Sequence, residues 1–202
     1  MQEKTSRKLI LASNNAGKAR EFKRMLEPIG IELLTLKEAG VSMTAEETGT
    51  TFAENARIKA MSIYEKTHLA TVADDSGICI DFYEGGPGVY SARYLGEDTS
   101  YDIKNGHILD EMKDAEDSKR GARYVCHITC VLSEDNIIDC EGVCEGKIGR
   151  TPAGNGGFGY DPIFYVGDKS FGELSDAEKD KQSHRGKALR KLYLALKEQD
   201  NK

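Results

Sequence analysis

Apolar positions along the chain repeat with the periods of strands and helices in turn. Residues 8–13 and 31–36 are short apolar runs, each of which predicts a strand. Residues 16–29 predict a helix that Pro28 and Gly30 end, and a second helix is expected from Thr50 or Thr51 to about residue 66. The apolar residues that would form the inner faces of these helices are Ala19, Phe22, Met25, Leu26 and Ile29 in the first, and Phe52, Ala56, Ala60 and Ile63 in the second.

The second half of the chain adds strands that follow one another directly. Residues 69–82 hold two apolar, strand-like segments around Asp74-Asp75-Ser76-Gly77, and residues 122–149 predict a long β-hairpin that turns at 133–136. Helices are expected near 99–113 and over 176–199. Because strands and helices interleave while the hairpin is antiparallel, the pattern predicts an α/β fold with a mixed sheet, as a single domain over residues 1–202.

Composition narrows the classes of partner. The 28 lysines and arginines are outnumbered by 34 acidic residues, which gives a net charge of −6 and disfavours general binding to nucleic acid. No apolar run approaches the roughly 20 residues that span a bilayer, and the apolar stretch near the N-terminus is too short for a signal peptide. We therefore expect a cytoplasmic protein with no membrane partner, whose five cysteines are reduced and buried in strands.

The stretch LILASNNAGKAREF, residues 9–22, has the form of a phosphate-binding turn. It is not a P-loop, because Ala12 and Ala19 occupy the positions where that motif has its first glycine and its Ser/Thr. A strand-to-helix turn still offers free amides and a favourable helix dipole to an anion, and Lys18 adds a positive charge. The alternative is a plain helix cap beside a surface lysine.

Carboxylates elsewhere could hold a metal ion. Asp74 and Asp75 follow an apolar run, and adjacent strand residues point to opposite faces, so the two should differ in role. Glu46 and Glu47 precede the second predicted helix and could supply another ligand. The alternative is a turn-forming DDSG sequence and a solvated acidic loop.

Two later segments could bind a nucleobase. GNGGFGYDP, residues 154–162, combines a flexible backbone with Phe158 and Tyr160, rings that can stack on a base, and with Asp161. Residues 178–191 contribute a group of basic side chains, among them Lys179, His184 and Arg185. Taken alone, this second segment is better explained as a solvated basic helix face.

Six segments together give a more specific indication. LASNNAGKAREF, AEETGTTFAENARIKA, ADDSGICID, GGPGVYSARYLG, GNGGFGYDPIF and SHRGKAL, in this order, resemble the inosine triphosphate pyrophosphatase family, which acts on non-canonical purine nucleotides. The resemblance implies Mg²⁺-dependent hydrolysis of ITP, dITP and XTP to the monophosphate and pyrophosphate. It also implies a homodimer of bilobed α/β subunits, each with a long central mixed sheet flanked by helices and an active site in the interlobe cleft.

The same resemblance assigns roles to residues by motif. Asp75 would be the proton acceptor and a metal ligand, Glu46 (or its neighbour Glu47) the second metal ligand, and Lys18 and Lys59 the cations that act on the phosphates. The substrate-binding residues would be Ser13, Asn14, Asn15, Ala16, Gly17 and Lys18 in the phosphate turn, Ser76 beside Asp75, and Phe158, Gly159, Tyr160, Asp161, Lys179, His184 and Arg185 around the nucleotide. The family's turn often has glycine where this chain has Asn14, a residue that tolerates left-handed backbone well.

A different class of function fits the same residues less well. A regulatory protein could sense purine nucleotides without turning them over, but Asp75, Lys18 and Glu46 together favour hydrolysis. The sequence gives no order of preference among ITP, dITP and XTP and no account of how GTP, which also has a 6-oxo group, is rejected.

Overall fold

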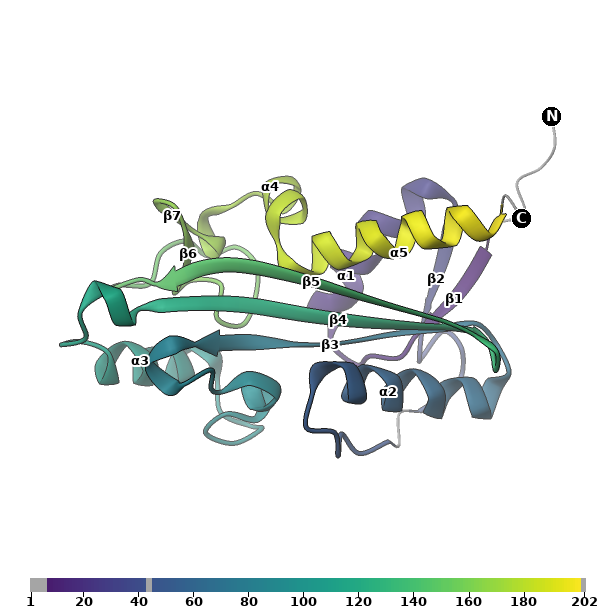
Figure 1. The fold of residues 1–202 in the computed structure, drawn as a ribbon, viewed down its shortest axis with the longest axis horizontal. Coiled ribbons are helices and arrows are strands. Elements are labelled where there is room, and N and C mark those ends of the chain that lie inside the picture. The colour runs from purple at the N-terminus through teal and green to yellow at the C-terminus, as the bar shows by residue number, and fades with distance from the viewer. Residues whose placement is uncertain (1–6, 43–44, 201–202) are drawn as a thin grey trace. The chain divides into compact units, whose positions relative to one another are not determined.

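The computed structural model describes residues 7–42 and 45–200, and Figure 1 shows its elements. The helices are α1 (Ala16–Leu26), α2 (Phe52–Thr67), α3 (Tyr101–Glu111), α4 (Asp176–Gln182) and α5 (His184–Asp200). The strands are β1 (Arg7–Leu11), β2 (Ile31–Thr35), β3 (Thr71–Ile80), β4 (Gly121–Ser133), β5 (Asn136–Ile148), β6 (Phe164–Val166) and β7 (Lys169–Ser170).

The seven strands form one sheet in the order β2-β1-β3-β4-β5-β6-β7. Strand β1 runs parallel to β2, with Leu9 opposite Leu33, and parallel to β3, with Ile10 opposite Thr71. Strand β6 is antiparallel to both β5 and β7. The predicted mixed sheet of an α/β fold is therefore confirmed.

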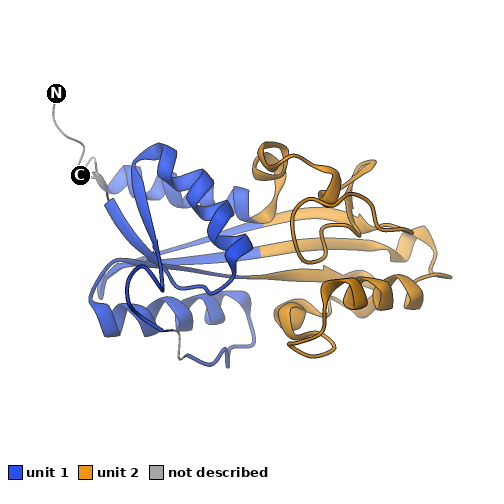
Figure 2. Ribbon diagram, turned by 180° about the vertical axis from the view of Figure 1, so that it is seen from behind, with its two compact units in different colours: residues 1–75, 126–142, 185–202 blue, residues 76–125, 143–184 orange. Residues whose placement is uncertain are grey.

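The chain divides into two compact units, coloured separately in Figure 2. Unit 1 comprises residues 1–75, 126–142 and 185–202, and unit 2 comprises residues 76–125 and 143–184. Strands β3, β4 and β5 each contribute residues to both units.

In unit 1, the alternation of side chains along β1 supplies two separate apolar layers. Leu9 and Leu11 pack with α1 and α5, whereas Ile10 and Ala12 pack with α2. Strand β3 repeats the pattern, because Val72 belongs to the first layer and Ala73 to the second. The core of unit 1 is therefore built on both faces of its part of the sheet.

The core of unit 2 is rich in aromatic rings. The ring of Tyr124 on β4 stacks on that of Phe171 with 5.9 Å between centroids and meets Phe164 edge-on at 4.7 Å. Ile108 and Met112, from α3 and the residue after it, pack into the same cluster and are fully buried.

Two predicted boundaries are wrong. Residues 71–80 form one continuous strand, not two segments separated by a turn at 74–77. The C-terminal segment is two helices, since Ser183 has extended backbone (φ −66°, ψ 157°) between α4 and α5. Strand β3 continues through Asp74 and Asp75 because side chains from distant helices neutralise both charges, as described below.

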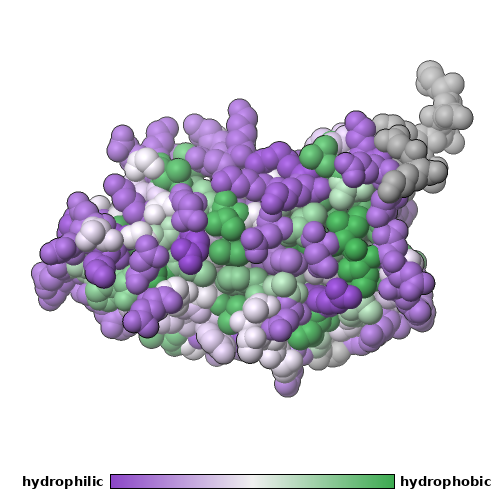
Figure 3. All heavy atoms as spheres, viewed as in Figure 1, coloured by the Kyte–Doolittle hydropathy of each residue, from purple (hydrophilic) through white to green (hydrophobic). Residues whose placement is uncertain are grey.

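No helix in residues 7–42 and 45–200 has both the length and the apolar character needed to cross a bilayer. Hydrophilic side chains cover much of the face drawn in Figure 3, with smaller hydrophobic groups between them. Four of the five cysteines, Cys126, Cys130, Cys140 and Cys144, are buried in β4 and β5 as predicted.

Candidate active site

The predicted phosphate turn connects β1 to α1. The side chain of Asn15 caps the helix by accepting a 3.0 Å hydrogen bond from the amide of Lys18, and the Ser13 hydroxyl accepts one of 3.2 Å from the amide of Asn15. The first turn, Ala16–Ala19, carries no acidic side chain, so its end of the helix dipole stays positive. The predicted strand–turn–helix is thus confirmed.

Lys18 lies at the start of α1 and reaches β3. Its Nζ is 3.1 Å from Oδ1 of Asp74 and 3.4 Å from that residue's carbonyl oxygen. Burial and the nearby Lys59 and Arg185 lower the pKa of Lys18, against the attraction of Asp74. The cation that the sequence assigns to phosphate is therefore held beside a buried carboxylate.

Asp74 is completely buried and joins three elements of unit 1. Its Oδ2 accepts hydrogen bonds from Nε and Nη2 of Arg185 at 3.1 and 2.9 Å, and Nη1 of Arg185 donates to Glu21 at 2.5 Å. Although burial opposes ionisation, Lys18 and Arg185 hold the pKa of Asp74 well below its usual value. Arg185, which the resemblance places around the nucleotide, has a guanidinium that donates to two carboxylates of unit 1.

Asp75 points to the other face of β3, toward α2. Its Oδ1 is 3.0 Å from Nζ of Lys59, and its Oδ2 accepts a 3.4 Å hydrogen bond from Asn55. Burial raises the pKa of the Asp75 carboxyl, because the positive charges of Lys59 and Lys18 do not fully offset the lost hydration. The predicted difference in role between the two aspartates is matched by a difference in partners.

Helix α2 places Asn55 and Lys59 on one face, one turn apart, and both are buried. The helix begins with a capping box, in which Thr51 accepts from the amide of Glu54 and the Glu54 carboxylate accepts from the amide of Thr51. Asn55 also accepts a 2.8 Å hydrogen bond from the amide of Gly49, so it connects the preceding loop to Asp75. Sequence reasoning missed Asn55, whose signal is its spacing of four residues from Lys59.

Of the two adjacent glutamates, Glu47 belongs to this cluster. Its Oε1 is 2.8 Å from Nζ of Lys59, whereas Glu46 is exposed. Burial lowers the pKa of Lys59, but the carboxylates of Asp75, Asp74 and Glu47 outweigh this effect and raise it. The assignment of Glu46 to a metal stays a prediction, and the geometry favours the alternative, Glu47.

The carboxylates of Asp75 and Glu47 converge on one ammonium group. Within residues 7–42 and 45–200, no three His, Cys, Asp or Glu side chains are grouped so that they could hold a metal by themselves. Mg²⁺ typically takes one or two protein carboxylates and completes its six oxygens from water and substrate phosphates. The pair is suited to a metal ion that arrives with a phosphate group.

In unit 2, the glycine-rich loop is organised around Asp161. Its Oδ2 accepts hydrogen bonds from Nζ of Lys179 at 2.6 Å and from the amide of Phe158 at 2.7 Å. The ammonium of Lys179 also lies 4.7 Å from the centre of the Phe158 ring. Gly157 has φ +71°, and a Cβ there would overlap the Asp161 carboxylate, so the turn requires glycine.

Three further predicted residues belong to unit 2. The ring of His184 stacks on Tyr124 with 4.4 Å between centroids and 7° between planes. The hydroxyl of Tyr160 donates to the carbonyl of Ser91 at 2.7 Å. Ser76 lies in β3 next to Asp75 and is partly buried.

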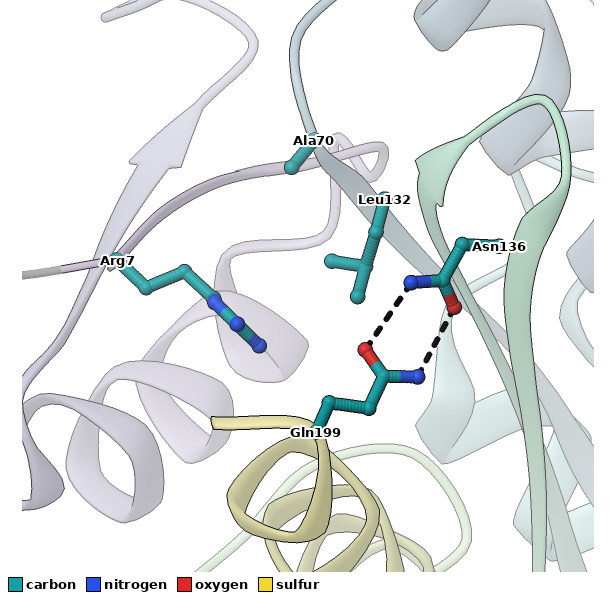
Figure 4. Close-up of a pocket in the computed structure, with 5 residues that line it drawn as sticks. All are labelled: Arg7, Ala70, Leu132, Asn136 and Gln199. Atoms are coloured by element: carbon teal, nitrogen blue, oxygen red, sulfur yellow. Dashed lines mark hydrogen bonds between the residues drawn. The ribbon is translucent and has the colours of Figure 1, made fainter. Parts of the chain in front are cut away.

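Each unit also contains a surface cavity. The loop at 152–159 and helix α3 line a cavity of about 490 Å³ in unit 2. In unit 1, a cavity of about 660 Å³ is lined by Arg7, Ala70, Leu132, Asn136 and Gln199. There the amides of Asn136 and Gln199 exchange hydrogen bonds of 3.1 and 2.9 Å (Figure 4). None of the predicted site residues is among the described residues that line the second cavity.

The structure thus gathers the predicted residues into two groups. Lys18, Lys59, Asp75 and Arg185 lie in unit 1 with Asp74, Glu21, Asn55 and Glu47. Phe158, Tyr160, Asp161, Lys179 and His184 lie in unit 2. The first group can neutralise phosphate charge and accept a proton. The second offers the ring of Phe158, next to the buried ion pair of Lys179 and Asp161.

Comparison with known proteins identifies the family. The model of the Ham1 family matches residues 9–195. The dITP/XTP pyrophosphatase of Bacillus licheniformis is 45% identical over 193 residues, which cover 94% of this chain and 98% of that protein. The dITP/XTP pyrophosphatase of Escherichia coli is 43% identical over 194 residues, with 94% and 98% covered. A HAM1 protein from Coxiella burnetii has a similar structure, with a TM-score of 0.85 and 40% identity over 95% of this chain and 99% of that one.

These similarities extend over both groups of residues. The matched range begins within β1, before the phosphate turn, and ends within α5, so it includes Lys18, Asp75, Phe158 and His184. The resemblance predicted from the six sequence segments is confirmed by matches along nearly the whole chain. The chain belongs to the Ham1 family.

Proposed function

We propose that this protein hydrolyses dITP, ITP and XTP to the nucleoside monophosphate and pyrophosphate, in a reaction that depends on Mg²⁺. One observation carries the proposal: Asp75, a buried carboxylate with a raised pKa, lies 3.0 Å from the ammonium of Lys59. The names of the relatives in Bacillus licheniformis and Escherichia coli support the same activity.

The phosphates would be held by groups of unit 1. The amides at the start of α1 and the ammonium of Lys18 offer hydrogen bonds and charge to oxygen anions. Lys59 adds a second cation on the α2 face of β3. Because a triphosphate gains negative charge on its leaving group during cleavage, cations placed in advance lower the barrier.

Asp75 would accept the proton from the attacking water. The water oxygen forms a bond to the α-phosphorus, the bond from that phosphorus to the bridging oxygen breaks, and pyrophosphate leaves with the bonding electrons. A carboxyl whose pKa is raised by burial is a better base than an ordinary aspartate. Lys59 and Asn55 keep the carboxylate oriented.

Asp75 and Glu47 would hold the Mg²⁺ ion, with Glu46 as the alternative second ligand predicted from the sequence. Oxygens of Asp75 and Glu47 lie 3.0 and 2.8 Å from the same Lys59 nitrogen, so the two carboxylates are close together. Two carboxylates and the phosphate oxygens of the substrate are typical ligands of Mg²⁺. When bound, the ion would supply neutralisation of phosphate charge and polarise the phosphoryl group.

The base would be recognised by groups of unit 2. Phe158 offers a ring for stacking, and the loop backbone or His184 would donate a hydrogen bond to the 6-oxo oxygen of hypoxanthine or xanthine. Adenine has an amino group at that position and would leave the donor unpaired, which is a strong basis for discrimination. The guanidinium of Arg185 is paired with Asp74 and Glu21, so we assign Arg185 to holding in place the unit 1 residues that would bind the phosphates.

The decisive experiment measures pyrophosphate release from ITP, dITP, XTP, GTP and ATP with Mg²⁺, and repeats it with EDTA. We expect fast hydrolysis of the first three, much slower hydrolysis of GTP and ATP, and loss of activity with EDTA. Equal rates for all five nucleotides, or no hydrolysis of any, would contradict the proposal. Tight binding of ITP without turnover would instead indicate a nucleotide sensor. The resemblance also supports a homodimer in the cytoplasm. Light scattering of the purified protein would test whether it is a dimer.

A further inference from the structure

Helix α3 contacts the glycine-rich loop of unit 2 through two residues one helical turn apart. The Nδ2 of Asn105 donates a 3.1 Å hydrogen bond to the carbonyl of Gly159. The ring of Tyr101 meets that of Tyr160 edge-on, with 5.2 Å between centroids and 89° between planes. Successive loop residues are thus held by the same face of α3.

Asn105 is an unfavourable residue for its position. It lies in the middle of α3, where asparagine is a weak helix former, and its side chain is only 6% exposed. Its Oδ1 is buried and makes no hydrogen bond to any residue in the described part of the chain. A buried amide that satisfies only part of its bonding capacity lowers stability, and such residues are found preferentially where function requires them.

The bond from Asn105 acts at a sensitive point of the loop. Gly159 has left-handed backbone with φ +73° and lies between Phe158 and Tyr160. On one side, the amide of Phe158 is fixed by the carboxylate of Asp161. On the other side, the Tyr160 hydroxyl is fixed by the Ser91 carbonyl. The bond to Asn105 fixes the peptide between these two anchors, so it limits the directions that the Phe158 ring can take.

We infer that Asn105 is a positioning residue, which holds the Gly159 peptide and thereby sets the Phe158 ring for stacking on the purine. The inference rests on the proposed function, because it assigns Phe158 to the base. It predicts that Asn105 affects substrate binding more than the chemical step, since the residue belongs to unit 2 and the proposed proton acceptor Asp75 belongs to unit 1.

The test replaces Asn105 with leucine, which has a similar size, and with aspartate, which keeps an oxygen but loses the donor. The matched control is Asp102→Ala. Asp102, like Asn105, is a polar residue of α3 that lines the cavity of unit 2. For N105L we expect KM for dITP and XTP to rise about fivefold to tenfold, the effect of one hydrogen bond, with kcat within about twofold. We expect the Tm of N105L to be equal to or higher than that of the wild type, and D102A to keep the wild-type KM.

The outcomes separate this inference from the proposed function. If both variants keep the wild-type KM, or if kcat and Tm fall together while KM does not change, Asn105 is only structural and the inference is wrong. If N105L fails to fold, N105D gives the same comparison. If the wild type hydrolyses no nucleotide, the proposed function fails, and amide hydrogen exchange at Phe158 still tests the inference. Exchange should be faster in N105L than in the wild type, and equal exchange would overturn the inference.

Discussion

Asp74 and Asp75 are consecutive residues of β3, yet their carboxylates face opposite sides of the sheet and meet different cations. Asp74 accepts from Arg185 at 2.9 Å and pairs with Lys18 at 3.1 Å, on the side of α1 and α5. Asp75 pairs with Lys59 at 3.0 Å on the side of α2. Under the proposed function, Asp74 would serve the structure and Asp75 the chemistry, and the predictions that follow depend on that separation.

The two aspartates should respond oppositely to the same substitution. Asp75→Asn should slow hydrolysis by about 10²-fold or more, because it removes the proposed proton acceptor. It should leave Tm unchanged or higher, because burial in the fold opposes ionisation of this carboxyl. Asp74→Asn should destabilise the protein by about 3–5 kcal/mol, because Arg185 and Lys18 lose a buried counter-charge. Urea unfolding and pyrophosphate release measure both effects. An active D75N, or a D74N as stable as the wild type, would contradict this assignment.

Acid should destabilise the protein partly through Asp74. Its pKa in the folded state is depressed below the value of about 3.9 for an unfolded aspartate, so its contribution is present above that pH and is lost as the pH falls through the folded-state pKa. The free energy of unfolding should therefore fall below about pH 4, with a shallower slope in D74N. Asp75 has the opposite sign, because its raised pKa favours the folded state at low pH, so D75N should lose stability in acid more steeply than the wild type. Equal slopes for all three proteins would refute this.

The neighbouring glutamates should be separable by kinetics. Glu47→Gln should reduce kcat more than Glu46→Gln, because the Glu47 carboxylate is 2.8 Å from Lys59 while Glu46 is exposed. The loss in E47Q should be partly offset by raised Mg²⁺ concentration if this carboxylate is a metal ligand. Activity measured against Mg²⁺ concentration for both variants provides the comparison. A larger loss of kcat in E46Q would instead support Glu46 as the metal ligand, as first predicted from the sequence.

Removal of the Phe158 ring should weaken substrate binding. Loss of a base-stacking ring costs about 1–3 kcal/mol, so Phe158→Ala should raise KM for dITP about 5-fold to 150-fold. The ring lies against the Lys179 ammonium, which places it beside the buried ion pair of unit 2. Phe82→Ala is the matched control, because it removes a ring that is 40% exposed and outside the proposed site. Equal KM values for F158A and the wild type would exclude stacking on this ring.

The elements near the site were largely predictable from local pattern. The apolar run over residues 8–13 predicts a strand, which is β1, and a cap at Thr50 or Thr51 predicts the start of α2, where the structure has Thr51 as the cap. A helix cap was expected in the turn before α1, and Asn15 supplies it. These features depend on residues a few positions apart, where backbone propensity and side-chain bonds act together.

What the sequence could not show depends on contacts between distant residues. Asp, Ser and Gly favour turns, so the run 74–77 was expected to interrupt the strand, but Arg185 lies 111 residues further along the chain and compensates Asp74. Glu21, 164 residues from Arg185, gave no local signal of its role. Glu46 and Glu47 differ by one position, and only the folded loop distinguishes the exposed side chain from the one beside Lys59.

The division of the chain between the two units constrains the order in which they can form during synthesis. Every residue of unit 2 precedes residue 185, so unit 2 is translated before the segment of unit 1 that begins at Arg185. The core of unit 1 packs Leu9 and Leu11 against Leu189, Leu192 and Leu196 of α5. The phosphate turn is thus translated long before α5, and the apolar layer that supports it can close only after α5 has been made.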